Sequence, residues 1–290
     1  MELDRRALLA AGLVAIGGCT MRPLRAALGD EDFEAVRATL GPAARLGVAA
    51  LDTGSGRMLR FDADSRYAMC STFKAALAGA VLASVDRGER SLVDELAIGP
   101  ADFVQHAPAV TANLDRGRMT IEALCAAIVE LSDNAAANLL LREIGGPAGF
   151  TAFVRRCGDA VTRLDRFEPE LNSNIPGDPR DTTTPAAMLG LMRSLLVGSV
   201  LTSAARARLA GWMEASPTGR ERLRAGFPAD WRAGDKTGTG NGANNDVAIA
   251  WPPGRAPLLV ASYIDAREAP NAARNAAHAA VGRIVAERLG

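Results

Sequence analysis

The two lysines of this chain lie in sequence patterns that could support nucleophilic catalysis. They are the only lysines among the 33 basic residues of the chain, and all the others are arginines. Lys74 lies three residues after Ser71, and Lys236 begins the run Lys236-Thr237-Gly238. A compositional bias toward arginine would explain the low lysine count but not these two positions. A buried ammonium can lose its proton, whereas a guanidinium stays charged. Because a serine hydroxyl needs such a neighbour to become a nucleophile, we predict that Ser71 and Lys74 act together.

A second group of polar residues could complete a hydrolytic site. Ser132-Asp133-Asn134 precedes a predicted helix, and these residue types would also serve as its N-terminal cap. Glu168 and Asn172 lie further along, in a polar loop. A carboxylate and a carboxamide can hold a water molecule between them, and the carboxylate can then act as its base. We therefore predict that Glu168 and Asn172 activate the water that releases a covalent intermediate.

The elements that must position these residues follow from the spacing of apolar side chains. Two early strands flank a turn, and three late strands with hairpin-like spacing follow a helical middle, which favours an antiparallel sheet. We predict an α+β fold, in which a five-stranded antiparallel sheet is flanked by the N- and C-terminal helices and joined to an all-helical lobe. Strands are predicted over 45–51, 57–61, 231–237, 246–251 and 258–264, and helices over 30–40, 71–87, 120–131, 135–144, 147–156, 185–196, 204–214 and 271–289.

The order of these elements divides the chain into two lobes. Residues 20–64 and 217–290 are expected to form the α/β lobe, and residues 65–216 the all-helical lobe. The polar stretch 163–183 within the second lobe is rich in proline and glycine, and a loop of this length is usually functional or disordered. The candidate residues should meet in a cleft between the lobes.

Composition narrows the range of functions. The 33 basic residues balance 33 acidic ones, so no net field favours nucleic acid or an anionic membrane. Two histidines offer little for a metal centre, and we expect neither a metal nor an organic cofactor. The glycine-rich run 238–243 has the glycine density of a dinucleotide-binding turn, but a predicted strand rather than a helix follows it. Cys70, Cys125 and Cys157 match no zinc site and are predicted to be buried and free.

Residues 1–19 are predicted to be an export signal. Arg5-Arg6 provide a charged start, and the apolar stretch 7–18 is too short to span a bilayer as a helix. The segment resembles a twin-arginine signal, and the sequence ending at Cys19 resembles a bacterial lipobox, in which Cys19 would carry a lipid anchor. An ordinary cleaved signal peptide is the alternative. Each of these readings predicts an exported, periplasmic protein.

Four elements occur in a defined order: Ser71-x-x-Lys74, Ser132-Asp133-Asn134, Glu168-x-x-x-Asn172 and Lys236-Thr237-Gly238. In this order the chain resembles the class A serine β-lactamases from about residue 30 to its C-terminus. The resemblance implies hydrolysis of the β-lactam amide bond, and hence antibiotic resistance. It implies a Ser71 acyl-enzyme that is released by a water activated by Glu168. The chain is expected to act as a monomer.

The resemblance also implies roles for the remaining candidates. Ser132 would carry a proton to the leaving lactam nitrogen, and Asn134 would position Lys74 and the substrate side-chain amide. Asp133 is expected to be structural. The backbone N–H groups of Ser71 and Thr239 would form the oxyanion hole.

The substrate carboxylate would be bound by the Lys236 ammonium and the Thr237 hydroxyl. Arg222 would add a second contact to this carboxylate or would be a solvated arginine. His106 falls where many members carry an aromatic side chain that lines the cleft, although a loop histidine without a role is the alternative.

Four further features can be checked from the resemblance. An Arg166–Asp181 ion pair should close the neck of the loop, and the peptide bond before Pro169 should be cis. Some carbapenem-hydrolysing members pair the cysteine before the nucleophile with one just after the Lys-Thr-Gly strand. Here Cys70 is present but the matching position is Gly240, so that disulfide cannot form. Other members pair the cysteine at position 125 with one at position 78, which is Ala78 in this chain.

Three other functions would account for part of the same motifs. A penicillin-binding peptidase acting on D-Ala-D-Ala stems would share three of the four motifs but would not need Glu168 and Asn172. A β-lactam-sensing domain would be acylated and remain so, and would normally require a spanning segment or a fused signalling domain. A catalytically inactive surface lipoprotein conflicts with the completeness of the motifs.

Overall fold

The computed structural model describes residues 30–290, and the predicted export signal with Cys19 lies outside the described residues. A five-stranded antiparallel sheet has the strand order β2-β1-β9-β8-β7, as predicted for the fold class. Its strands are β1 (Arg45–Asp52), β2 (Met58–Phe61), β7 (Arg232–Thr239), β8 (Ala243–Trp251) and β9 (Leu258–Asp265). Strand β7 lies at one edge, which leaves its outer side free to border a cleft.

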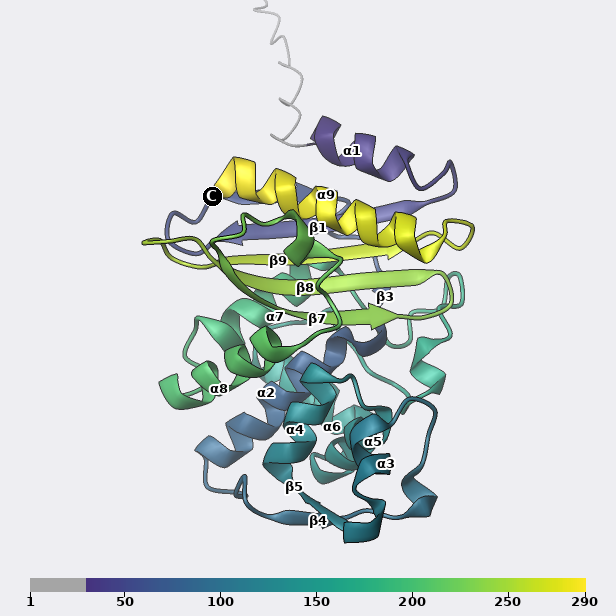
Figure 1. The fold of residues 1–290 in the computed structure, drawn as a ribbon, viewed down its shortest axis with the longest axis vertical. Helices are drawn as coiled ribbons and strands as arrows, with labels where there is room; N and C mark the ends of the chain where they lie inside the picture. The colour runs from purple at the N-terminus through teal and green to yellow at the C-terminus, as the bar shows by residue number, and fades with distance from the viewer. Residues whose placement is uncertain (1–29) are drawn as a thin grey trace, which may run out of the picture.

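Helices cover both faces of this sheet (Figure 1). The terminal helices α1 (Asp30–Ala38) and α9 (Asn271–Leu289) lie on one face, as predicted. Side chains alternate between the two faces along a strand. Accordingly Val48 packs in the core beneath the terminal helices, whereas Ala49 joins the larger core on the opposite face.

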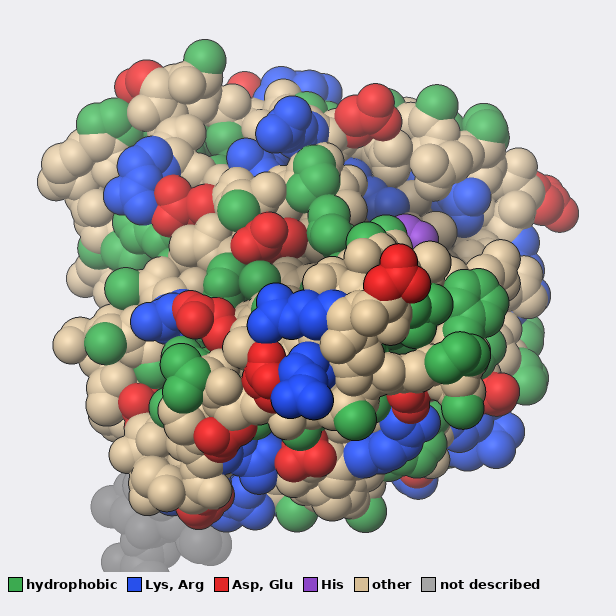
Figure 2. Space-filling view, turned by 60° about the horizontal axis from the view of Figure 1, so that its bottom comes forward, with side chains coloured by type: hydrophobic (Ala, Val, Ile, Leu, Met, Phe, Trp, Pro, Cys, Tyr) green, Lys and Arg blue, Asp and Glu red, His purple; other side chains and the backbone are tan. Residues whose placement is uncertain are grey.

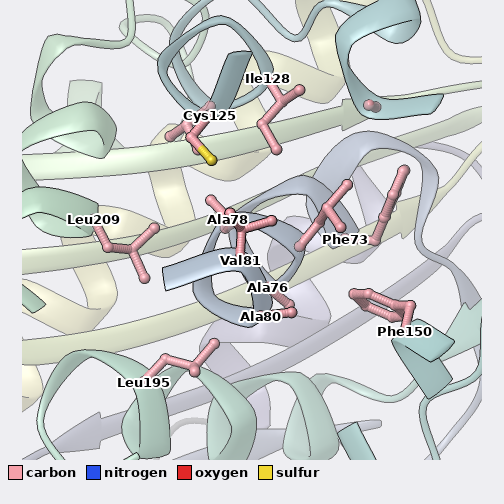
Figure 3. Close-up of a cluster of buried hydrophobic side chains, with 14 of the residues drawn as sticks. Phe73, Ala76, Ala78, Ala80, Val81, Cys125, Ile128, Phe150, Leu195 and Leu209 are labelled. Carbon is pink, nitrogen blue, oxygen red and sulfur yellow. The ribbon is translucent and has the colours of Figure 1, made fainter. Parts of the chain in front are cut away.

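The second face carries the helical layer, whose centre is helix α2 (Phe73–Asp86). Twelve of its 14 residues are buried, so α2 is apolar on all sides rather than amphipathic. Small side chains let its neighbours approach closely: Cys125 and Leu195 lie beside Ala78 and Gly79 (Figure 3). The other helices are α3 (Pro108–Ala112), α4 (Ile121–Glu130), α5 (Asn134–Glu143), α6 (Gly146–Arg156), α7 (Pro185–Leu196) and α8 (Ser203–Ala215).

Two details of segment 65–216 differ from a purely helical arrangement. Strand β3 (Tyr67–Ala68) pairs with β6 (Thr182–Thr183), and β4 (Glu95–Ala97) pairs with β5 (Arg118–Thr120). The first of these short ladders joins the end of the 163–183 loop to the residues just before Ser71. Among residues 30–290, no helix combines the length and apolar character needed to cross a membrane.

The ends of the predicted elements match the observed ones to within two residues, with one informative exception. Strand β8 begins at Ala243, three residues before the predicted start at 246. The asparagines that open it were poor candidates for a strand, but both are buried through tertiary hydrogen bonds. Asn244 Nδ2 donates to Asn271 of α9 at 2.8 Å, and Asn245 Nδ2 donates to the carbonyl of Ala68 at 2.8 Å. These long-range partners override the local preference against a strand.

Candidate active site

A cleft opens where the edge strand β7 meets the helical layer. Its volume is about 330 Å³, and Figure 2 shows a hollow across this face with a histidine side chain visible in it. The residues that line the cleft are Ser71, His106, Ser132, Asn134, Asn172, Thr218, Arg222, Thr237 and Thr239. All but Thr218 were predicted from the sequence. The remaining predicted residues, Lys74, Glu168 and Lys236, are buried.

Ser71 lies in a short 3₁₀ turn, η1 (Cys70–Thr72), that leads directly into α2. Because the turn continues into the helix, Ser71 and Lys74, which are three residues apart, lie on the same face. The Lys74 ammonium donates a hydrogen bond to Ser71 Oγ at 3.0 Å. The hydroxyl therefore has a nitrogen within proton-transfer distance.

The Lys74 side chain is completely buried and is surrounded by oxygen atoms. Its Nζ lies 2.8 Å from Glu168 Oε1, 2.9 Å from the carbonyl of Ser132 and 2.5 Å from Asn134 Oδ1. An ammonium has only three protons, so these atoms and Ser71 Oγ cannot all accept from it at once. Burial lowers the pKa of Lys74 below its usual value, and the Glu168 carboxylate opposes this shift. The site can therefore hold Lys74 either as a cation or as a base.

Ser132 lies between the two lysines. Its backbone has φ of +59°, and its Oγ is 3.5 Å from Lys74 Nζ and 3.1 Å from Lys236 Nζ. Lys236 also donates to the carbonyl of Thr237 at 2.8 Å. Burial and the positive charge of Lys74 lower the pKa of Lys236 to about 7. A hydroxyl between two such ammonium groups is well placed to pass a proton.

Asp133 has a structural position, as the sequence suggested. Its carboxylate accepts from the Ala136 N–H at 2.8 Å and so caps α5. The other oxygen accepts from the N–H groups of Ala109 and Val110, which begin α3. Asp133 thus caps the N-termini of two helices and fixes the backbone next to Ser132.

The carboxylate of Glu168 is directed to Lys74 on one side and to Asn172 on the other. Asn172 Nδ2 lies 2.5 Å from Glu168 Oε2. The peptide bond between Glu168 and Pro169 is cis, as predicted. Asn138, which the sequence analysis missed, accepts from the Glu168 N–H and donates to its carbonyl, both at 2.9 Å. A buried asparagine four residues after Asn134 on the same helix was the signal that could have revealed it.

The neck of the loop is closed by the predicted ion pair. Arg166 Nε lies 2.6 Å from Asp181 Oδ2, and Asp181 is fully buried. The other oxygen of Asp181 accepts from the backbone N–H groups of Asp165 and Arg166 at 2.7 and 3.0 Å. One buried carboxylate therefore satisfies three donors and joins the two ends of the loop.

Replacing Asp181 with alanine should destabilise the protein by about 3 kcal/mol. This is the lower end of the range for a broken buried ion pair, because Arg166 is partly exposed. Urea denaturation would measure the change in the free energy of unfolding. The control is Asp64→Ala, whose carboxyl is 82% exposed in an ion pair with Arg60 and should cost less than about 1 kcal/mol. Equal losses for the two variants would contradict the assignment.

Strand β7 approaches the 3₁₀ turn η1 very closely. A Cβ at Gly238 would lie 2.7 Å from the carbonyl of Met69, so only glycine permits this contact. The contact brings the backbone of Thr239 to the same cleft as Ser71. The two N–H groups predicted to form an oxyanion hole therefore come from adjoining segments.

Arg222 is buried, with 7% of its surface exposed, which excludes the solvated alternative. It donates to the carbonyls of Gly238 and Asn245 and to Thr239 Oγ1, the last at 2.8 Å. The guanidinium thus stabilises the end of β7 through hydrogen bonds and also lines the cleft.

Thr218 is a second cleft residue that the sequence analysis missed. Its hydroxyl lies 2.9 Å from Thr237 Oγ1 and 3.0 Å from Ser216 Oγ. No motif marks Thr218, because it follows Pro217 in an irregular segment and reaches Thr237 only through the fold.

His106 lies in the loop before α3, with φ of +63°. Its Nε2 lies 3.0 Å from the carbonyl of Leu131, and its own carbonyl accepts from the Asn134 N–H at 2.9 Å. His106 is among the residues that line the cleft.

The three cysteines of the described chain are free, as predicted, but only Cys70 and Cys125 are buried, and Cys157 is partly exposed. A Cβ at Gly240 would lie 2.7 Å from Cys70 Sγ, so these two positions do face each other. Cys125 lies beside Ala78 (Figure 3), again facing a residue that cannot form a disulfide.

Comparisons with known proteins agree with this geometry. The sequence model of the β-lactamase enzyme family matches residues 32–289. The β-lactamase AST-1 of Nocardia asteroides is 43% identical over 302 aligned positions, covering 99% of this chain and 96% of that protein. The carbapenem-hydrolysing β-lactamase KPC of Klebsiella oxytoca is 46% identical, with 84% of each chain covered. The solved structure of the class A β-lactamase of the last common ancestor of Gram-negative bacteria has a TM-score of 0.87 and 52% identity, covering 90% and 99% of the two chains.

Proposed function

This chain belongs to the class A β-lactamases, and from that premise we propose which of its residues carry out the reaction. The enzyme hydrolyses the amide bond of β-lactam antibiotics and confers resistance to them. In our proposal Ser71 attacks the lactam carbonyl and forms an acyl-enzyme, which a water activated by Glu168 then releases. The observation that carries the proposal is the contact chain Ser71 Oγ, Lys74 Nζ and Glu168, with separations of 3.0 and 2.8 Å.

The acylation step needs a group that removes the proton from Ser71. Lys74 can take it directly, because burial lowers its pKa, or through a water held by Glu168. The negative charge that develops on the lactam oxygen is stabilised by the backbone N–H groups of Ser71 and Thr239. As the ring opens, Ser132 gives its proton to the leaving nitrogen and regains one from Lys74 or Lys236. The contacts of Ser132 with both lysines support this role.

The deacylation step needs a base beside the acyl group. Asn172 lines the cleft that contains Ser71 and contacts the buried Glu168 carboxylate, and together these two side chains can hold the attacking water. Asn138 positions Glu168 by binding both of its backbone polar groups. A penicillin-binding peptidase would have no need for this second set of residues.

The carboxylate of the substrate is held at the β7 side of the cleft. Lys236 supplies the positive charge, the Thr237 hydroxyl donates a hydrogen bond, and Arg222, which lines the cleft, contributes a second positive charge. Thr218 orients the Thr237 hydroxyl. Asn134 and His106 face the side chain of the substrate from the opposite wall.

Substrate binding should weaken as pH rises above about 7. The free enzyme has a Lys236 pKa of about 7, so the ammonium that attracts the carboxylate is present below this pH and lost above it. The dissociation constant of a penicillin should approach a tenfold rise per pH unit in the alkaline range. Measuring it in a Ser71→Ala variant separates binding from the titration of Lys74 as a base. In Lys236→Arg the guanidinium stays charged, so the dependence should disappear; a flat profile in both proteins would refute the assignment.

We further propose that residues 1–19 export the protein to the periplasm, with Cys19 as a site for a lipid anchor. The mature enzyme acts as a monomer whose α/β lobe comprises residues 20–64 and 217–290 and whose helical lobe comprises residues 65–216. These proposals rest on the sequence pattern of the signal and on the order of the elements. Mass spectrometry of the protein recovered from bacterial membranes would test the lipid anchor.

The test of the whole proposal is hydrolysis of a chromogenic cephalosporin with intact mass recorded during turnover. Many turnovers per enzyme, with a transient adduct that maps to Ser71, are expected. A protein that stops after one equivalent, with a stable adduct on Ser71, would refute the hydrolytic role of Glu168 and leave the peptidase or the sensor. An adduct on another residue would refute Ser71 as the nucleophile.

A further inference from the structure

The 163–183 loop also borders a second cavity, which shares no lining residue with the catalytic cleft. This cavity has a volume of about 330 Å³, within the range of small-molecule sites. One wall is the loop from Leu171 to Thr182, and the other is formed by residues 65–68 and the start of β1. We refer to it as the loop cavity. It is independent of the chemistry proposed above.

The lining of the loop cavity is strongly basic. It contains four arginines but only two acidic residues, Asp178 and Asp265. The arginines are Arg45, Arg66, Arg166 and Arg180. Neither lysine of the chain lines this cavity, so all of its positive charges are guanidinium groups. Guanidinium groups suit phosphate and carboxylate because their N–H donors match the spacing of two oxygens.

Both acidic residues of the lining already have a partner within the protein. Asp178 forms an ion pair with Arg180 at 2.7 Å, and Asp265 accepts from Asn174 Nδ2 at 3.0 Å. Arg166 is paired with Asp181, as described above. Arg45 is paired with Asp62 at 3.4 Å, which leaves Arg66 as the one arginine of the lining that forms no ion pair within residues 30–290.

Arg66 has the clearest capacity for a ligand. Its Nη1 donates to the carbonyl of Val161 at 3.1 Å and to Thr182 Oγ1 at 3.0 Å. Within residues 30–290, its Nε and Nη2 make no hydrogen bond and it forms no ion pair. These two groups form one edge of the guanidinium, which can bind two oxygens of a single anion. Arg45 lies beside it and donates to its carbonyl, while its contact with Asp62 is long, at 3.4 Å, and exposed.

We propose that the loop cavity binds a small free oxyanion that carries phosphate groups, with the open edge of Arg66 as its main contact. The volume accommodates phosphate or pyrophosphate, and Arg45 supplies further charge from the same wall. Arg66 also donates to the carbonyl of Val161, just before the loop, and to Thr182, near its end, so an anion bound to Arg66 lies beside both ends of the loop. The loop cavity would therefore bind its anion against the same loop that carries Glu168.

The test is calorimetric titration of the purified protein with inorganic pyrophosphate at constant ionic strength. The expected result is saturable binding of one anion per protein. Arg66→Gln should weaken it at least about tenfold, because two charge-assisted hydrogen bonds are lost. The matched control is Arg283→Gln, which removes the same charge from the exposed side of α9 and should change the dissociation constant less than about twofold.

Steady-state kinetics then distinguishes the loop cavity from the cleft, whose Lys236 and Arg222 could also attract an anion. Pyrophosphate in the loop cavity should leave KM unchanged, whereas pyrophosphate in the cleft would raise KM in proportion to its concentration. Absence of binding, or binding that persists in Arg66→Gln, would overturn the proposal. So would Arg66-dependent sedimentation with phosphatidylglycerol vesicles without binding of pyrophosphate, because the phosphate would then belong to a lipid headgroup.

Discussion

Replacing Ser71 with alanine is expected to lower kcat about 10⁶-fold, the scale seen when a covalent nucleophile is removed. No other hydroxyl can take its place: Ser132 Oγ is held by Lys236, and Thr237 Oγ1 contacts Thr218. The substrate should still bind, because the groups that hold its carboxylate are intact. Turnover of a chromogenic cephalosporin measures the loss, and intact mass should show no adduct.

The control for this change is Ser203→Ala, which removes an exposed hydroxyl at the start of α8. It should leave kcat and KM unchanged. If Ser71→Ala retained more than about 1% of the parental kcat, or still formed a covalent adduct, another residue would have to be the nucleophile.

Replacing Glu168 with glutamine is expected to block the second half of the reaction and leave the first half intact. Loss of a general base typically costs about 10²–10⁴-fold, so the acyl-enzyme should accumulate on Ser71. Acylation should survive because Glu168 raises the pKa of Lys74, and its removal favours the neutral amine that can accept the serine proton. A burst of one equivalent followed by slow release, with the adduct seen by intact mass, would be the measured result.

The matched control for this variant is Glu170→Gln, two residues further along the same loop. Glu170 is exposed and makes no contact with Lys74, so its replacement should leave turnover at the parental rate. A Glu168→Gln protein that turned over at the parental rate would show that another group activates the water. A protein that could no longer be acylated would instead assign Glu168 to the first step.

The sequence predicted the fold and the main part of the site because both depend on local signals. Nearly continuous runs of apolar residues, buried on both faces of the sheet, define β1 and β9, and the buried helix α2 follows directly from the Ser71-x-x-Lys74 run. The order of four short motifs predicted that residues between Ser71 and Thr239 share one cleft, and residues from this range line the cleft in the structure. The ion pair at the loop neck and the cis bond before Pro169 were likewise found where expected.

What the sequence did not reveal depends on contacts between distant segments. Thr218 reaches Thr237 only because an irregular segment folds against the end of β7. The burial of Arg222 arises from its bonds to the carbonyls of Gly238 and Asn245, which no local pattern predicts. Asn138 could have been noticed as a polar residue on a buried helix, but its partner lies 30 residues away.

The burial of α2 has a consequence for how this enzyme can change during evolution. The nucleophile is attached to a segment whose side chains are packed on every side, so almost any substitution there disturbs the core. The base is attached to a loop whose outer surface is largely exposed, from Ile175 to Gly177. We therefore expect substitutions at Ile175 to Gly177 to be tolerated without moving Ser71, whereas substitutions on α2 should be tolerated far less often.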